Sequence, residues 1–318
     1  MLCNIFMINL RHIIKFLGII IFSLLLSTQV FADKKADKRF EKDLKKISKD
    51  NAFVDNLGKT YSVDTISDKK NTILIVYTHG SLGEKILDKC NKKWNKAPPI
   101  ILNLHEEKIK DFKVKIYHLC SGVRGWTENH WRKMSDIYKN SSKDNFSKII
   151  KDDFDRIKFN GAKQFRKQKV IINKVEELIN LGFENIILAG HSAGGWASIT
   201  LKSKYPNKIS GAIAINPAFA GKINNRREWK FWELVRNYGV SQIDLKNLNN
   251  TIIYVHDKDG WETSKTLSFL NLDTVEYKDI SKSNCKPKLI FGKHHGIPLT
   301  KCFAESDVNQ KEMIKFLE

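Results

Sequence analysis

Hydrophobic positions after residue 70 alternate between short apolar runs and longer stretches with helical spacing. The apolar runs predict strands at 72–77, 114–119, 185–189, 211–215, 251–255 and 288–291. The clearest helix is predicted over 164–181, because it has an apolar face and Gly182 follows its end. That face is predicted to consist of Ile171, Val175, Leu178 and Ile179. Alternating strands and helices predict an α/β fold with a mostly parallel central sheet and helices on both faces, in a single domain over 70–318.

The first seventy residues have a different pattern. Arg11, His12 and Lys15 precede the apolar run 16–26, which is followed by Val-Phe-Ala at 30–32. This pattern predicts a signal peptide over 1–32, cleaved after about Ala32 in an exported protein. A retained membrane anchor is the alternative, but the apolar run is short for a span.

Residues 33–69 predict a charged helix with a thin apolar stripe, followed by a hairpin at the edge of the sheet. Within 33–50 the apolar positions are Phe40, Leu44 and Ile47, spaced for one helical face. The strands 52–54 and 60–63 flank the turn sequence Asp-Asn-Leu-Gly.

The most informative stretch is 190–195, which reads Gly-His-Ser-Ala-Gly-Gly between the predicted strand 185–189 and a predicted helix. A sharp turn from strand to helix would push the Ser192 hydroxyl outward, and Gly190 and Gly194 would leave room for the tight backbone. Such a string also arises by chance, but the strand before it and the helix after it favour a nucleophile. The sequence therefore predicts that Ser192 is a nucleophile.

A serine nucleophile needs a base to accept its proton and a carboxylate to orient that base. The predicted strand 251–255 is followed by His-Asp-Lys-Asp-Gly at 256–260, and the predicted strand 288–291 by Gly-Lys-His-His-Gly at 292–296. These stretches offer Asp259 as the acid, with Asp257 as its rival, and His295 as the base, with His294 as its rival.

The order Ser192, Asp259, His295 resembles the α/β-hydrolase family, in which nucleophile, acid and histidine follow one another in this order. The resemblance covers about 70–318. Within the family, the simple architecture is similar to that of dienelactone-hydrolase-like and carboxylesterase-like members. It implies an oxyanion hole made by the backbone N–H of Ala193 and that of Ser81, with Leu82 as the alternative. His256 departs from the family, which has glycine at that place, and this departure leaves Asp257 open.

The formal net charge of +20 is carried mostly by scattered lysines. No stripe of arginine and aromatic residues is evident, so we expect no nucleic-acid partner, only a weak attraction to anionic envelope surfaces. Patterns typical of metal or phosphate binding are absent as well, so we expect neither a metal nor a cofactor.

Removal of residues 1–32 would leave an even number of cysteines, namely Cys90, Cys120, Cys285 and Cys302. In an exported protein this favours disulfides over free thiols. Cys285 precedes the predicted strand 288–291 and Cys302 follows His295, so these two are expected to pair, leaving Cys90 with Cys120.

Together these features predict an exported serine hydrolase that cleaves a small carboxylic ester through an acyl-enzyme on Ser192. The alternatives are a non-catalytic envelope-binding protein with the same fold, and a peptidase or transacylase with the same triad. The tryptophan-rich connections 121–160 and 221–250 are expected either to border the substrate or to pin these loops to the core. The sequence indicates neither the acyl group nor the oligomeric state.

Overall fold

The computed structural model describes residues 38, 41–80, 90, 96–122, 163–228, 230–286 and 294–318. The chain divides into two compact units, 1–45 and 46–318. In the first unit, residues 41–45 are helical. Among the described helices, none combines the length and the apolar character that a membrane span requires. The predicted signal peptide lies outside the described residues.

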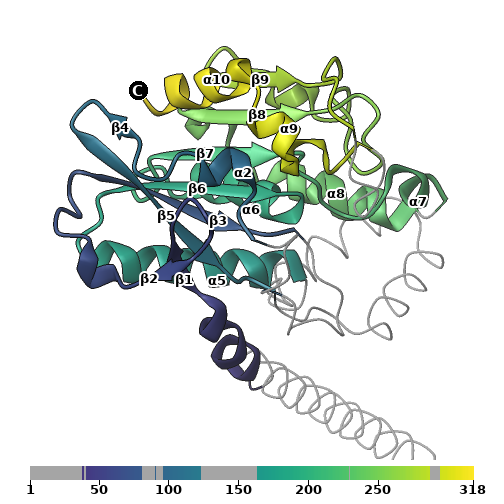
Figure 1. Ribbon diagram of the computed structural model, residues 1–318. Helices are drawn as coiled ribbons and strands as arrows, with labels where there is room; N and C mark the ends of the chain where they lie inside the picture. The colour runs from purple at the N-terminus through teal and green to yellow at the C-terminus, as the bar shows by residue number, and fades with distance from the viewer. Residues whose placement is uncertain are drawn as a thin grey trace, which may run out of the picture. The chain divides into compact units, whose positions relative to one another are not determined.

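The unit 46–318 is built on one mixed sheet, which contains nine strands among the described residues (Figure 1). In chain order they are β1 (Ala52–Val54), β2 (Thr60–Tyr61), β3 (Thr72–Thr78), β4 (Lys108–Ile109), β5 (Phe112–Leu119), β6 (Asn185–His191), β7 (Gly211–Ile215), β8 (Thr251–Val255) and β9 (Val275–Asp279). Their spatial order is β2-β1-β5-β3-β6-β7-β8-β9, and β4 pairs with β5. All neighbours from β5 to β9 along this order are parallel, whereas β1, β2 and β4 pair antiparallel.

Strand β3 lies in the middle of the sheet. Ile75 in β3 pairs with Ile116 of β5 on one side and with Ile187 of β6 on the other. All seven residues of β3 are buried. A continuous apolar run is what a parallel strand needs when both of its faces are covered.

Helices cover both faces of the sheet. The described α-helices are α2 (Pro99–Leu102), α5 (Lys163–Asn180), α6 (Ala193–Lys204), α7 (Ile223–Glu228), α8 (Lys230–Ser241), α9 (Lys301–Ala304) and α10 (Asp307–Leu317). The described 3-10 helices are η1 (Ser48–Asp50), η2 (Val63–Thr65), η4 (Leu245–Asn247), η5 (Ser268–Leu270) and η7 (Ile297–Leu299). Neighbouring residues of β8 belong to different hydrophobic cores. Ile252 belongs to the core that contains Phe303 of α9, and Ile253 belongs to the core that contains Trp196 of α6. The predicted fold class is therefore confirmed.

Most predicted elements occur in the structure. Strands β3, β5, β6, β7 and β8, helix α5 and the hairpin β1–β2 occur where the sequence predicted them, and β2 ends the sheet. Exposed Ile179 is an exception to the predicted apolar face of α5. The structure adds β4 and β9, which the sequence pattern did not predict. The predicted strand 288–291 lies outside the described residues.

Two disulfides tie distant parts of the unit together. Cys90 is bonded to Cys120 at the end of β5, and Cys285 is bonded to Cys302 in α9. Both are the pairs expected from the sequence. The second bond closes a loop that contains His295.

Candidate active site

Ser192 occupies the turn between β6 and α6 with a strained backbone. Its φ of 55° and ψ of −121° lie in a region that side-chain-bearing residues seldom adopt. Hydrogen bonds hold the turn: Ser192 N–H donates to Ile215 O at 3.0 Å, and Ser192 O accepts from Trp196 N–H at 3.0 Å and from Ala218 N–H at 3.1 Å. Strain that neighbouring contacts maintain in this way is typical of a functional turn.

The turn packs directly on the backbone at the end of β3, which is why it needs glycine. A Cβ on Gly194 would lie 2.1 Å from Thr78 O, and a Cβ on Gly190 would lie 2.3 Å from the carbonyl carbon of Gly194. A Cβ on Gly80 would lie 3.2 Å from Ser192 Cβ. The turn that follows β3 is therefore adjacent to Ser192.

Asp259 and His295 form a buried pair. His295 Nδ1 lies 2.6 Å from Asp259 Oδ2, and the side chains are 3% and 1% exposed. Asp259 Oδ1 accepts a second hydrogen bond, at 2.8 Å, from the backbone N–H of Trp261. An ionised carboxylate can only accept, so Nδ1 of His295 carries the proton and Nε2 is left as an acceptor.

The rival residues face other partners. Asp257 is 48% exposed, and its Oδ1 lies 3.0 Å from His256 Nδ1. The ring of His294 stacks at 4.4 Å on that of His256. The structure thus brings Asp259, and not Asp257, into contact with His295.

His295 is fixed next to the serine turn by residues that the sequence analysis did not identify. His191 Nε2–H and Asn216 Nδ2–H both donate to His295 O, each at 2.9 Å. The rings of His191 and Trp261 lie 4.6 Å and 4.5 Å from that of His295. Burial, followed by the adjacent His295, lowers the pKa of His191 well below its usual range, so His191 acts as a neutral donor.

Neither Ser192 Oγ nor His295 Nε2 makes a hydrogen bond within the described part of the chain. His295 Nε2 is buried and has no partner there. An acceptor left unpaired in a buried position is destabilising unless it meets a donor during function.

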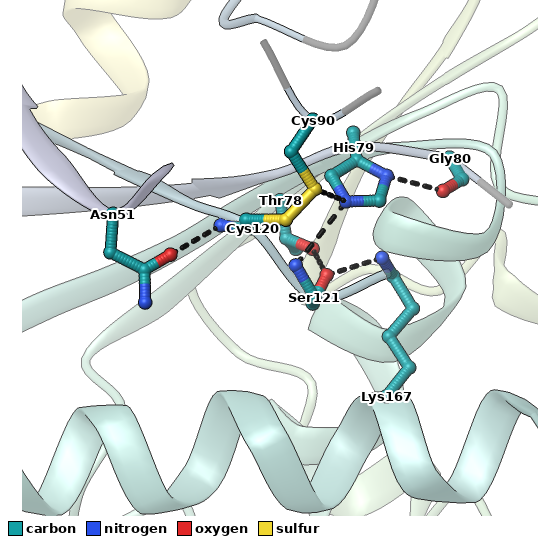
Figure 2. Close-up of a disulfide and its surroundings, with 8 residues drawn as sticks. All are labelled: Asn51, Thr78, His79, Gly80, Cys90, Cys120, Ser121 and Lys167. Carbon is teal, nitrogen blue, oxygen red and sulfur yellow. Dashed lines mark hydrogen bonds between the residues drawn. A yellow bond between two sulfur atoms is a disulfide. The ribbon is translucent and has the colours of Figure 1, made fainter. Parts of the chain in front are cut away.

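The turn after β3 is held from behind by His79 (Figure 2). His79 Nδ1–H donates to Gly80 O at 2.6 Å, and Nε2 accepts from Ser121 N–H at 3.2 Å. Burial, with the charge of Lys167 second, lowers the pKa of His79 well below its usual range, so both bonds are made by the neutral ring. Ala193, the predicted first oxyanion donor, opens α6, where an N–H lacks a helical acceptor. The predicted second donor, Ser81, and its alternative Leu82 lie outside the described residues.

Lys167 of α5 is a buried lysine that the sequence analysis did not single out. Figure 2 shows its Nζ donating to Ser121 Oγ, which in turn contacts Thr78 Oγ1 at the end of β3. Burial lowers the pKa of Lys167 well below its ordinary value, and Lys163 lowers it further. Gln164, one turn earlier in α5, donates to Ala193 O at 3.1 Å. Helix α5 therefore contacts the serine turn directly and is connected to the end of β3 through Ser121.

A buried ionic cluster joins the segment after β7 to the loop that bears Asp259. Glu262 accepts hydrogen bonds at 2.9 Å from both Arg226 of α7 and Arg236 of α8. Arg226 also donates to Trp261 O at 2.9 Å, directly behind the ring that packs on His295. The tryptophan-rich connection 121–160 lies outside the described residues apart from Ser121 and Gly122.

One set of side chains has the donor types of a metal site. The ligand atoms of His79, Cys90 and Cys120 all lie within 4.8 Å of one another. The two sulfurs are joined in a disulfide, so they are not thiolate ligands.

No family model matches the sequence, and no curated protein matches it. The structure is similar to Est1E from Butyrivibrio proteoclasticus, at 10% identity and a TM-score of 0.45, over 84% of this chain and 93% of that one. It is also similar to a lipase-esterase related protein from Clostridium acetobutylicum, at 14% identity and a TM-score of 0.40, over 84% and 98% of the two chains. A putative dipeptidyl aminopeptidase IV from Bacteroides ovatus matches at 15% identity and a TM-score of 0.46, over 84% of this chain and 35% of that one. By its own strand order, its covering helices and its strained serine turn after β6, the chain has the α/β-hydrolase fold.

Proposed function

We propose that the protein is a serine hydrolase that cleaves carboxylic esters through an acyl-enzyme on Ser192. The observation that carries the proposal is the buried Asp259–His295 pair next to the strained Ser192. Nε2 of His295 has no hydrogen-bond partner among the described residues, and the His295 ring packs on that of His191, the residue before Ser192. A binding protein without catalytic activity has no need for this arrangement.

In the proposed reaction Ser192 Oγ attacks the ester carbonyl carbon while its proton passes to His295 Nε2. Throughout the reaction Asp259 accepts a hydrogen bond from Nδ1–H of His295 and stabilises the positively charged imidazolium. Collapse of the tetrahedral intermediate breaks the bond to the leaving alcohol, whose oxygen takes the proton from Nε2. Water then attacks the acyl carbon while its proton passes to His295 Nε2. The bond between the acyl carbon and Ser192 Oγ breaks, Oγ takes that proton back, and the carboxylic acid is released.

The negative oxygen of the intermediate would be stabilised by the N–H of Ala193 and by the N–H of Ser81. The N-terminal end of α6 adds a partial positive charge at the same place. Close packing of Gly194 on Thr78 supports this role, because it fixes the distance between the serine turn and the turn after β3.

We further propose that the protein acts outside the cytoplasm, after cleavage near Ala32. The disulfides Cys90–Cys120 and Cys285–Cys302 support this location, because structural disulfides persist in oxidising compartments.

The test combines covalent labelling with turnover. The purified protein is treated with a fluorophosphonate probe and assayed on p-nitrophenyl esters of increasing chain length and on peptide p-nitroanilides. Ser192→Ala should abolish labelling and lower ester turnover on the order of 10⁴- to 10⁶-fold, because the nucleophile is lost. Ser241→Ala, on an exposed serine at the end of α8, is the control and should change neither.

A Ser192→Ala variant that keeps more than about a tenth of the activity would exclude Ser192 as the nucleophile. Faster cleavage of the anilides than of the esters would point to a peptidase. A wild-type protein that neither labels nor turns over any substrate would favour the binding protein without catalytic activity.

A further inference from the structure

A cavity of about 680 Å³ lies outside the residues of the candidate active site. The hairpin β1–β2, the segment leading into α2 and the segment from η7 to α9 surround it. Its wall is mainly aliphatic, formed by Val54, Leu57, Ala97, Pro98, Leu102 and Leu299. This volume lies in the range of cavities that enclose small organic ligands.

His118 of β5 and Thr300 are the buried polar side chains of this wall among the described residues, and the Thr300 hydroxyl already donates to Ile297 O. His118 is 6% exposed, and its ring packs edge-on against Tyr77. Neither ring nitrogen has a hydrogen-bond partner within the part of the chain that the structure describes. A nearly buried ring at the wall of a cavity, with no described protein partner for its nitrogens, is suited to a ligand that supplies a hydrogen bond.

The potential around His118 is positive. Burial, and then the ammonium groups of Lys96 and Lys167, lower the pKa of His118 to about 4. Asp50, Glu305 and Lys301 also line the cavity, but no described carboxylate raises the pKa of His118. Near neutral pH His118 is therefore an uncharged N–H donor in a positive field, beside the exposed Lys96 at the cavity.

We propose that this cavity binds an aliphatic carboxylate, whose chain packs on the apolar wall and whose carboxylate accepts a hydrogen bond from His118 beside Lys96. Hydrogen bonds from N–H groups to ionised carboxylates are stronger than neutral ones, and Lys96 adds a favourable charge. No Trp or Phe occurs among the described residues of the wall, which favours an aliphatic chain over an aromatic ring. The site goes beyond the proposed hydrolase activity and does not depend on Ser192.

The first experiment compares head groups on one chain. Isothermal titration of the purified protein at pH 7.5 uses octanoate, 1-octanol and octyltrimethylammonium as probes. Octanoate should bind at one site with a dissociation constant at least about threefold below that of octanol, and the ammonium compound should bind more weakly than both. Equal binding of all three, or tighter binding of octanol or of the ammonium compound than of octanoate, would overturn the proposal.

The second experiment locates the site. His118→Phe keeps the ring volume and removes both nitrogens, so the preference for octanoate over octanol should disappear. Lys96→Gln should weaken octanoate binding roughly two- to fivefold, whereas Lys59→Gln, on an exposed lysine that does not line the cavity, should not. Unchanged octanoate binding in both His118→Phe and Lys96→Gln would reject the site.

A third measurement does not require the His118 variant to fold. Octanoate should raise the pKa of the His118 ring in wild-type protein, because a bound anion favours the charged ring. The pKa is measured from the histidine NMR signals during a pH titration. An unchanged pKa at saturating octanoate contradicts the proposal. Repeating the calorimetry after fluorophosphonate treatment separates this site from the active site: binding should persist, and its loss would place the octanoate at Ser192.

Discussion

The backbone of the Ser192 turn leaves almost no space for a larger side chain at its glycines. Gly194 meets the carbonyl of Thr78, which belongs to a strand paired on both sides and therefore cannot move aside. Gly260, beside the candidate acid, has no atom within 4 Å of the position of an added Cβ. These two glycines consequently form a matched pair for testing the packing of the turn.

Gly194→Ala should destabilise the protein by about 3 kcal/mol because the added methyl group meets backbone atoms. Gly260→Ala should change the free energy of unfolding by less than about 0.5 kcal/mol. Urea unfolding followed by tryptophan fluorescence measures both. Similar midpoints for the two variants would show that the turn is not packed as described.

The two candidate acids can be separated by isosteric replacement. Asp259→Asn should lower turnover of a p-nitrophenyl ester on the order of 10⁴-fold, because the amide favours the wrong tautomer of His295. Asp257→Asn should have little effect, since its carboxylate is half exposed and lies against His256. The reverse ranking in kcat would transfer the role of the acid to Asp257.

At the scale of single residues the sequence indicated the chemistry but not its supports. The sharp turn at Ser192 could be predicted because its motif is local, and the Asp259–His295 contact because each residue follows a strand or an expected one. The choice between Asp259 and Asp257 depended on their burial, which the sequence does not give. Asp259 is buried, whereas Asp257 is half exposed. His191, Asn216 and Trp261 contact His295 from segments far away in the chain, so no local pattern reveals them.

Among the elements, strands buried on both faces were predictable, whereas the polar edge strand β9 was not. Strands β3, β7 and β8 are continuous apolar runs that are buried throughout. Strand β9 reads Val-Glu-Tyr-Lys-Asp, and only Val275 is buried. An edge strand with polar residues in it resembles a loop in sequence, which explains why β9 was missed.

Helix α5 was predictable from its apolar face, but the burial of Lys167 was not, because lysine is almost always solvated. Its lowered pKa makes the stability of the protein depend on pH. At pH values between the lowered pKa of folded Lys167 and the ordinary lysine pKa, the unfolded chain binds a proton that folded Lys167 does not bind. The unfolded state then holds more protons, so this residue makes the protein less stable as the pH falls.

Lys167→Met should therefore raise the free energy of unfolding at pH 7 and reduce its increase between pH 7 and pH 10. Lys169→Met, on an exposed position of the same helix, is the control and should leave the pH dependence unchanged. Urea unfolding at both pH values gives the comparison. Wild type and Lys167→Met with parallel pH profiles would refute the account of Lys167.

On the scale of the whole molecule, the disulfide Cys285–Cys302 closes the loop that carries His295, with a sequence separation of 17. Restriction of the unfolded chain by a loop of this size contributes about 3 kcal/mol. The double variant Cys285→Ala and Cys302→Ala should lose about that much stability in urea unfolding. A double variant as stable as the wild type would show that the native contacts alone hold this loop.

The position of β3 in the sheet also has a consequence for how the chain folds. Both partners of β3 lie later in the sequence, and β6 ends only at His191. Pairings between such distant segments close large loops before they gain contacts, which places the folding time of such domains at the slow end of the range. Until β5 and β6 have paired with it, β3 is an apolar segment with two unpaired edges, and such segments promote aggregation. Refolding yield should therefore be limited by the concentration of the chain rather than by the stability of the finished sheet.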